Sequence, residues 1–191
     1  MSAPTVIVLA AGRGARFLAS GGTTHKLNAL VTGKPVLSHV LDAVAAAGLA
    51  WHLVQPDEGT GGMGESIALG VQATPDASGW LILPGDLPLI QPDTLRRVAA
   101  ALRDDRIVVP HYQQRPGHPP GFGRAWFSAL ASLTGDVGAR AIVQEARGRG
   151  AVVDLATEDI GVVQDVDTLA DLSVVTAIRE RARVRTLIGT G

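Results

Sequence analysis

The chain has 191 residues, 46% of them hydrophobic and 18% charged, with a formal net charge of -1 at pH 7. This length and composition indicate a globular protein with one sizeable core and exclude a disordered or fibrous chain. The balanced charge argues against general binding to nucleic acid or to a membrane surface, and the lack of cysteine excludes disulfides and thiolate metal sites.

The same features predict a cytoplasmic protein. A chain without cysteine suits a reducing compartment. No apolar stretch approaches the roughly 20 residues that span a bilayer. The first four residues lead directly into an apolar run, so no signal peptide is expected.

In chain order, the first predicted element is a buried strand over residues 6–9, which leads into a loop with Gly12, Arg13, Gly14 and Arg16. Small residues let the backbone approach a ligand closely, and the arginines add positive charge. The loop therefore indicates a phosphate-bearing ligand such as a nucleotide. A turn that merely joins a strand to a helix is the alternative.

Neither common nucleotide motif is present in the chain. Phe17 stands where the dinucleotide fingerprint has its third glycine. Pro35 follows Gly33 and Lys34, where a Walker loop has serine or threonine. The ligand is therefore not identified by either of these motifs.

Short apolar runs alternate with helical patterns along the rest of the chain. Further strands are predicted over residues 51–54, 80–83, 106–109, 151–155 and 160–166. Helices are predicted over residues 35–47, 67–71, 92–102, 126–133, 139–146 and from 167 or 168 to 178. Residues 113–123 are predicted to form a loop, and the arginine-rich residues 179–191 a helix end with a loose tail.

Strands that alternate with helices favour a Rossmann-like α/β fold, whose mostly parallel sheet is flanked by helices on both faces. In such sheets, ligands bind beyond the carboxyl ends of the strands. The loops at Gly12, residues 59–64, Asp86 and Asp165 are all expected at that edge.

Asp86 follows a predicted buried strand and lies between a glycine and prolines in Pro84-Gly85-Asp86-Leu87-Pro88. A carboxylate held in this way can bind a hard cation such as Mg²⁺. An Asx turn that organises the following loop is the equal alternative.

Several segments together resemble the nucleotidyltransferase superfamily with the nucleotide-diphospho-sugar transferase type of fold, and within it the molybdenum cofactor cytidylyltransferases and their purine-catabolism relatives. The segments that carry the resemblance are Leu9-Ala10-Ala11-Gly12-x-Gly14-x-Arg16-Phe17, Lys26, Gly62-Met63-Gly64-x-Ser66-Ile67, Pro84-Gly85-Asp86-Leu87-Pro88, Gly117-His118-Pro119, Gly135-Asp136-x-Gly138-Ala139-Arg140 and Asp165-Val166-Asp167-Thr168. Each segment is modestly specific, but their shared order is strongly specific. They span about residues 6–172, so residues 1–178 are predicted to form one nucleotidyltransferase domain and residues 179–191 a tail.

The resemblance implies a reaction in which a substrate phosphate attacks the α-phosphate of a nucleoside triphosphate and pyrophosphate leaves. It implies catalytic roles for Arg16, Lys26 and Asp86, which would stabilise and position charge. Asp86 and Asp165 would hold Mg²⁺. Asp167 is then expected to cap the next helix.

The resemblance also implies two binding sites. The residues implied in nucleotide binding are Leu9, Ala10, Ala11, Gly12, Gly14, Gly62, Met63, Gly64 and Ser66. The residues implied in acceptor binding are Gly117, His118 and Pro119. Ser66 could instead cap a helix, and His118 could simply pack between prolines.

Ala11 stands where the guanylyl-transferring branch usually has glycine, so the resemblance favours CTP as the donor. The predicted reaction transfers CMP from CTP to the phosphate of Mo-molybdopterin, forming molybdopterin cytosine dinucleotide and pyrophosphate. The alternatives are GTP as the donor, a sugar phosphate as the acceptor, or a non-catalytic protein that delivers cofactor to a molybdenum hydroxylase. The expected partners are therefore small-molecule substrates and such a client enzyme, with no nucleic acid or membrane, for a monomer or weak oligomer.

Two departures from the family pattern affect these expectations. Residues 17–25 are longer than usual before Lys26, with His25 where proline is common, and this insertion could act as a flexible lid. Residues 120–123 replace aliphatic residues of the family, which leaves the acceptor less certain than the nucleotide chemistry.

Overall fold

A twisted sheet forms the centre of the computed structural model, which describes residues 3–56 and 58–189. Within these residues the sheet has seven strands: β1 (Thr5–Leu9), β4 (Ala50–Val54), β5 (Gly79–Pro84), β6 (Ile107–Tyr112), β7 (Arg115–Pro116), β8 (Gly121–Gly123) and β9 (Val152–Thr157). Their order is β4-β1-β5-β8-β6-β7, and β9 pairs with the other side of β6. A separate hairpin joins β2 (Leu30–Val31) and β3 (Lys34–Pro35).

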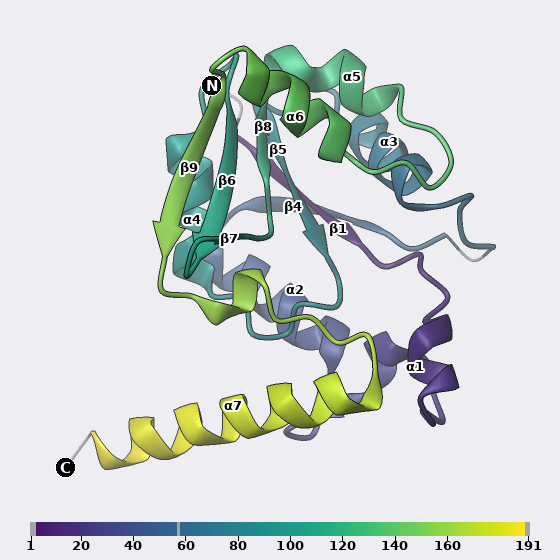
Figure 1. Cartoon of the computed structure of the whole chain (residues 1–191), viewed down its shortest axis with the longest axis vertical. Coiled ribbons are helices and arrows are strands. Elements are labelled where there is room, and N and C mark those ends of the chain that lie inside the picture. Colours follow the sequence, from purple (N-terminus) through teal and green to yellow (C-terminus); the bar gives the residue numbers. More distant parts are fainter. Residues whose placement is uncertain (1–2, 57, 190–191) are drawn as a thin grey trace.

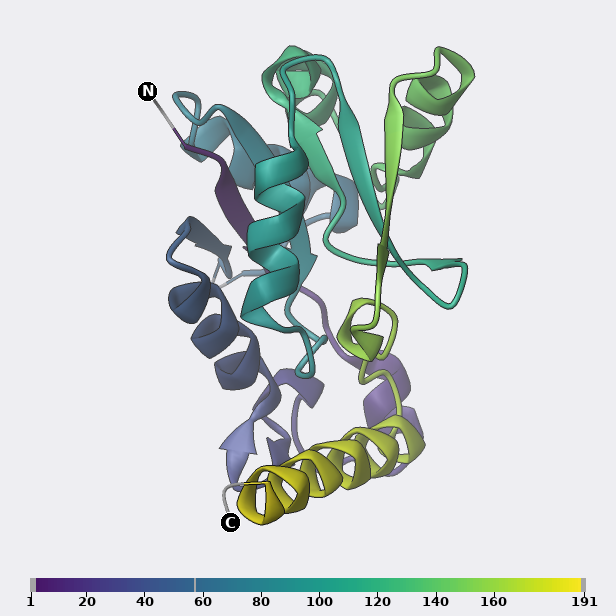
Figure 2. The same cartoon turned by 90° about the vertical axis from the view of Figure 1, so that its left-hand side faces the viewer.

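The pairings β1–β4, β1–β5 and β6–β9 are parallel, whereas β8 is antiparallel to both β5 and β6. The helices are α1 (Ala15–Ala19), α2 (Val36–Ala47), α3 (Met63–Ala73), α4 (Pro92–Ala101), α5 (Phe127–Ala131), α6 (Arg140–Gly148) and α7 (Leu169–Ile188). In Figure 1, α3, α5 and α6 cover one side of the sheet, while Figure 2 shows α2 and α4 on the other.

Apolar side chains that point alternately to the two faces of the sheet form one hydrophobic core on each face. In β1, Val6 and Val8 pack with residues of α2 and α4, whereas Ile7 packs with residues of α3. Successive side chains of a strand point to opposite faces, so a fully apolar strand requires helices on both sides. The structure thereby confirms the predicted mostly parallel α/β sheet with helices on both faces.

The structure corrects the prediction that residues 113–123 form only a loop. Their last three residues are β8, inserted between β5 and β6. A Cβ on Gly123 would overlap the carbonyl oxygens of Arg103 and Asp104. The strand was missed because its glycines, which permit this close approach, have low strand propensity.

The strand predicted over residues 160–166 is also wrong, because Ile160–Val162 form a 3-10 turn. Gly161 lies tightly against Leu89 and Ile90, where a Cβ would be 2.5 Å from the nitrogen of Ile90. Val162 and Val166 of this segment are fully buried. Buried positions select apolar residues in any conformation, so the segment has the composition of a strand without forming one.

The predicted loose tail is a helix for most of its length. Helix α7 continues through residue 178 to Ile188 and crosses one end of the molecule beside α1 (Figure 1). Val175 is its fully buried side chain. No helix within the described residues combines the length and the apolarity needed to cross a membrane.

Candidate functional site

The loop after β1 is shaped by Gly14 and His25. Gly14 has a φ of 65°, a left-handed conformation that glycine adopts without strain, and it precedes α1. The His25 Nε2 atom lies 2.5 Å from the carbonyl oxygen of Gly12, and Nδ1 accepts a hydrogen bond from the Leu27 nitrogen at 3.2 Å. These two contacts assign the ring proton to Nε2. His25 therefore joins the glycine loop to the segment that carries Lys26.

Lys26 lies at the centre of an ion-pair network. Its Nζ is 2.9 Å from Asp86 Oδ2 and 3.5 Å from Asp167 Oδ1. Asp167 Oδ2 also accepts a hydrogen bond from Arg16 Nη1 at 2.9 Å. Burial lowers the pKa of Lys26, but Asp86 and Asp167 outweigh it and raise that pKa above its usual value. The ammonium group is therefore charged at neutral pH.

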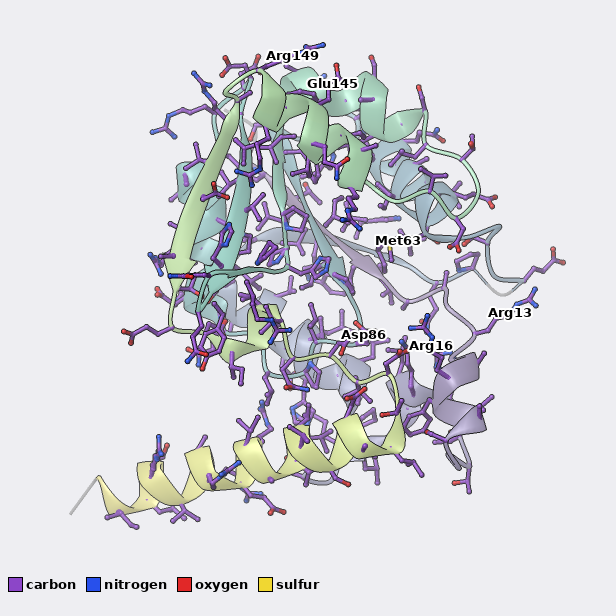
Figure 3. All side chains as sticks on the ribbon, in the orientation of Figure 1. Arg13, Arg16, Met63, Asp86, Glu145 and Arg149 are labelled. Atoms are coloured by element: carbon purple, nitrogen blue, oxygen red, sulfur yellow. The ribbon has the colours of Figure 1, made fainter. Side chains whose placement is uncertain are left out.

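Arg16 and Lys26 differ in exposure. The side chain of Arg16 is 81% exposed, whereas that of Lys26 is only 15% exposed. In Figure 3, Arg13 extends outward, whereas Arg16 and Asp86 belong to the network through Asp167 and Lys26. Lys26 is thus a largely buried charge within the site, and Arg16 is an exposed charge at its rim.

Asp165 is a second acidic group next to this network. Burial raises the pKa of Asp165, and the negative charges of Asp86, Asp171 and Asp167 raise it further. Asp86 and Asp165 line the same cavity. Two carboxylates that repel each other in this way are suited to a divalent cation, which would relieve the repulsion.

The described residues supply no cluster of three or more histidine, aspartate or glutamate side chains placed to hold a metal. Mg²⁺ typically takes one or two protein carboxylates and completes its shell with substrate phosphates and water. Asp86 and Asp165 therefore fit a metal ion that enters with a phosphate ligand, although Lys26 already contacts one oxygen of Asp86.

A cavity of about 560 Å³ opens at the carboxyl edge of β1 and β5. It is lined by Leu9, Ala11, Gly12, Arg13, His25, Lys26, Leu27, Thr60, Gly61, Gly62, Met63, Ser66, Pro84, Gly85, Asp86 and Asp136. A neighbouring cavity of about 240 Å³ shares Met63, Pro84 and Asp86 with it. The two spaces therefore meet beside Asp86.

Most of the residues predicted from the sequence come together in these two cavities, but several do not line them. Ala10 lines a third cavity of about 320 Å³ on the other side of the glycine loop. Gly14 shapes the loop, and Arg16 reaches the site through Asp167. The missed lining residues include Thr60, Asp136 and Arg115.

Gly62 and Gly64 are needed for packing. A Cβ on Gly62 would lie 2.6 Å from the Cα of Asp136, and one on Gly64 would lie 2.8 Å from the carbonyl oxygen of Thr134. The Asp136 carboxylate accepts a hydrogen bond from the Met63 nitrogen at 3.3 Å. Gly64 is buried in this contact, away from the cavities, whereas Gly62 and Met63 line the larger one.

Ser66 does not cap α3, because the cap residue is Gly62. The Ser66 hydroxyl lies 3.0 Å from the Gly62 carbonyl and 2.6 Å from Thr60 Oγ1. Ser66 thereby fixes Thr60 in the cavity wall. The signal for Thr60 was its place within the glycine-rich turn of residues 59–64.

His118 lies in the wall of the smaller cavity, where burial lowers its pKa while the charge of Asp86 opposes that shift. The backbone nitrogen of His118 donates to the Val162 carbonyl at 2.8 Å. A Cβ on Gly117 would overlap the same carbonyl group. Gly117 therefore shapes the loop, and His118 lines the cavity.

Thr168, and not Asp167, caps α7. The Thr168 side chain accepts from the Asp171 nitrogen, and the Asp171 carboxylate accepts from the Thr168 nitrogen, which is a capping box. The prediction that Asp167 is the cap is therefore wrong. The cap leaves the carboxylate of Asp167 free to bind Arg16 and Lys26.

The inserted residues 17–25 pack against the start of α7. Ser20 Oγ accepts a hydrogen bond from the Leu169 nitrogen at 3.0 Å, and the side chain of Leu169 contacts Gly21. Phe17 is buried in a hydrophobic cluster against which Leu169 also packs. The insertion predicted as a flexible lid thus forms packed contacts at its start.

A glycine loop, a largely buried lysine and two carboxylates lie at the carboxyl edge of a mostly parallel sheet, which is where α/β proteins of the nucleotide-binding class hold their ligands. Residues 45–151 match the family model described as the MobA-like NTP transferase domain. The chain belongs to this nucleotidyltransferase family.

Individual relatives support the same assignment. The bifunctional protein GlmU of Azoarcus sp. (strain BH72) is 33% identical in an alignment 142 residues long, which covers 62% of this chain and 30% of that protein. The GlmU of Bordetella petrii is 33% identical in an alignment 120 residues long, which covers 50% of this chain and 26% of that protein. The chain thus spans about 30% or less of the length of these two relatives.

Solved structures share the fold over nearly the whole chain. Rv0371c from Mycobacterium tuberculosis H37Rv is 27% identical with a TM-score of 0.73 and covers 92% of this chain and 98% of its own. A structure of Rv0371C in complex with manganese is 28% identical with a TM-score of 0.70 and the same coverage. A nucleotidyl transferase from Methanothermobacter has a TM-score of 0.80, covering 95% of this chain and 100% of its own, but 19% identity, which shows the fold alone.

Proposed function

We propose that this protein is an Mg²⁺-dependent cytidylyltransferase that transfers CMP from CTP to the phosphate of Mo-molybdopterin. The observation that carries the proposal is the meeting of two cavities beside Asp86, next to the buried charge of Lys26. The larger cavity has room for the nucleotide. The smaller cavity, lined by His118 and Arg115, suits an acceptor that carries an anionic group.

In the proposed reaction an oxygen of the acceptor phosphate attacks the α-phosphorus of the nucleotide. A new P–O bond forms, the bond from the α-phosphorus to the bridging oxygen breaks, and pyrophosphate carries away the electron pair. The attacking phosphate is already ionised, so no strong base is required. Catalysis then depends on holding the two substrates in line and on neutralising charge.

Each group of the chain has a place in this reaction. Backbone nitrogens of the loop over residues 11–14 would bind phosphate oxygens. Lys26 would neutralise charge at the α-phosphate, and Arg16 at the leaving pyrophosphate. Asp86 and Asp165 would hold Mg²⁺, which would supply positive charge at the phosphates. The manganese complex of Rv0371C supports the use of a divalent cation in the family.

The donor and the acceptor have different support. Ala11 lines the larger cavity, and its methyl group narrows the space next to the loop in favour of a pyrimidine base. The molybdopterin acceptor rests on the resemblance of the Gly117-His118-Pro119 segment. The GlmU relatives favour a second candidate, a sugar phosphate as the acceptor. Only with molybdopterin as the acceptor would a molybdenum hydroxylase receive the dinucleotide product.

Release of pyrophosphate tests the proposal directly. The protein is incubated with Mg²⁺, each of the four nucleoside triphosphates in turn, and either Mo-molybdopterin or a panel of sugar phosphates. We expect release with CTP and molybdopterin. Turnover with GTP alone would show that CTP is not the donor. Turnover with sugar phosphates alone would show that molybdopterin is not the acceptor.

Asp86→Asn tests the metal carboxylate in the same assay. Loss of the charge is expected to lower kcat by at least about 100-fold, which is typical for removal of one electrostatic stabiliser. Asp93→Asn is the matched control, because Asp93 is 71% exposed in the first turn of α4. Substantial activity in Asp86→Asn would remove Asp86 from the metal site.

A further inference from the structure

Helix α7 has a second face besides the one that joins it to the rest of the fold. Val175 is buried in the core cluster that includes Val36 of α2, and Leu172 packs against that cluster. Figure 1 shows the rest of the fold on one side of α7. At 3.6 residues per turn, positions 170, 174, 177, 181, 184 and 188 lie on the opposite side of the helix. These six positions therefore point away from the fold.

The residues at these six positions form an exposed stripe along α7. Val174, Val184 and Ile188 are 46%, 53% and 74% exposed. The spacing along the stripe alternates between four and three residues, which is the spacing of the core positions of a coiled coil. Over a length of about 27 Å, such a stripe is typical of a helix that pairs with another helix. This outer stripe consists of Ala170, Val174, Ala177, Arg181, Val184 and Ile188, all of them exposed.

The sizes of the side chains in the outer stripe fit a second copy of the same helix that runs antiparallel. With Val174 of one copy opposite Val184 of the other, Ile188 meets the small Ala170. Arg181 then meets the small Ala177, which leaves room for its stem while the guanidinium reaches the edge of the contact. In a parallel pair each residue would meet itself, so that Arg181 would face a second Arg181. The antiparallel pair is therefore favoured.

The charges beside the outer stripe favour the same arrangement. Residues 169–178 contain one charged side chain, Asp171, whereas residues 179–188 contain four arginines and one glutamate. Asp171 and Arg185 border the stripe on the same side, and antiparallel pairing places Asp171 of each copy beside Arg185 of the other. The Asp171 carboxylate is fixed there, because it accepts hydrogen bonds in the capping box of α7. Parallel pairing would instead bring the two arginine-rich halves together.

We propose that the outer stripe of α7 is an interaction surface for a second copy of this chain, which pairs its own α7 with it in antiparallel orientation. The same residues are then used by both copies, so the contact closes as a two-fold dimer. The inference does not depend on the proposed function, because none of the six residues of the stripe lines the three cavities. One helix from each copy makes a small interface, so the dimer is expected to be weak and to depend on concentration.

Disulfide trapping tests the orientation, because the chain contains no cysteine of its own. Val174→Cys and Val184→Cys are prepared separately in the full chain and oxidised either alone or as an equal mixture. We expect disulfide-linked dimers from the mixture and few from either variant alone. In the antiparallel pair, identical positions lie about 15 Å apart, which is too far for a disulfide. Linked dimers from each variant alone, with no gain on mixing, would overturn the antiparallel arrangement.

Sedimentation velocity measures the association itself. The wild-type chain is expected to shift from monomer toward dimer between about 5 and about 500 µM. Val184→Asp and Arg185→Glu should each raise the dimer Kd at least about tenfold, because the first buries a charge and the second places two acids side by side. Ala182→Asp and Arg183→Glu make the same changes of charge at exposed positions outside the stripe. These matched controls should change the Kd less than about threefold.

A wild type that remains monomeric at about 500 µM would overturn the inference. A dimer that all four variants weaken equally would also overturn it, because the effect would then follow net charge and not the stripe. A dimer that none of them weakens would place the interface elsewhere on the molecule. If the monomeric chain instead sediments with vesicles of phosphatidylserine and phosphatidylcholine, the stripe binds a membrane surface and the dimer is excluded.

Discussion

Lys26 and Lys34 both form ion pairs with aspartates, but in different surroundings. Lys26 is 15% exposed and lines the larger cavity, whereas Lys34 is 48% exposed and pairs with Asp42 on the surface. Lys26→Ala is expected to lower kcat for pyrophosphate release by about 100- to 1000-fold, because a fixed charge at the reacting phosphate is lost. Lys34→Ala is the control and should retain wild-type kcat. If Lys26→Ala is fully active, another cation must neutralise the charge at the reacting phosphate.

Asp154 forms an ion pair far from the cavities, and it predicts a pH dependence of stability. Arg147 donates two hydrogen bonds to its carboxylate, and His111 contacts it at 2.7 Å. The Arg147 hydrogen bonds lower the pKa of Asp154 to about 2, against the partial effect of burial. Since the folded pKa lies below the unfolded one, the pair stabilises the protein above about pH 4 and loses this effect as the pH falls toward 2.

Urea unfolding of the wild type and of Asp154→Asn measures this contribution. The side chain of Asp154 is 44% exposed, so the difference in unfolding free energy should be below about 1 kcal/mol. That difference should be constant from pH 5 to 7 and should vanish between pH 4 and 2. If the difference in unfolding free energy persists at pH 2, the ionised Asp154 carboxylate is not its source.

Residue roles differed in how far the sequence could predict them. Lys26 and Asp86 were proposed from motifs, and the structure brings them within 2.9 Å of each other. Asp167 was expected as a helix cap, because Asp and Thr are both good cap residues and stand next to each other. Side-chain direction decided between them, and only the packed structure contains that information.

At the scale of elements, α3 depends on close contact with the loop over residues 134–137. Gly64→Ala should lower the unfolding free energy by about 1–3 kcal/mol, since the new methyl group would overlap backbone carbonyl groups. Gly148→Ala in α6 is the matched control, because a Cβ there meets nothing within 4 Å. That variant should be stabilised by about 0.4–1 kcal/mol. Equal stability of Gly64→Ala and the wild type in urea unfolding would refute the contact.

The sequence predicted the long elements and missed the short ones for a physical reason. Strands such as β1 and β5 are apolar on both faces, so their residues alone identify them. Strand β8 has three residues, two of them glycines, and exists because it fits between β5 and β6. Residues 160–166 have strand-like composition but lack a neighbouring strand to pair with, and Ile160–Val162 turn instead.

At the scale of the whole molecule, the predicted division at residue 178 falls inside α7. Beyond this point Arg179 donates to the Pro88 carbonyl at 3.3 Å, while Val184 and Ile188 are 53% and 74% exposed. Figure 2 shows the helix across one end of the molecule, where Val175, before the division, belongs to the same core cluster as Val36 of α2. We propose that residues 1–178 remain a folded nucleotidyltransferase domain without residues 179–191.

A chain truncated after Ile178 tests this division. Its unfolding free energy should fall by at least about 1 kcal/mol, the net value of the lost hydrogen bond from Arg179 to the Pro88 carbonyl. Binding of CTP with Mg²⁺ should match that of the full chain, since none of the described residues 179–189 lines the three cavities. The change is followed by urea unfolding and equilibrium dialysis. If the truncated chain does not fold, residues 179–191 are part of the folded domain.

The sequence by itself determined the α/β fold and the candidate phosphate-binding loop, because these depend on local patterns of apolar residues and glycine. Tertiary structure decided which side chains meet. It placed Asp167 between Arg16 and Lys26, and Asp136 at the start of α3. These contacts join residues 73 to 151 positions apart in the chain, and no local pattern encodes a distance of that kind.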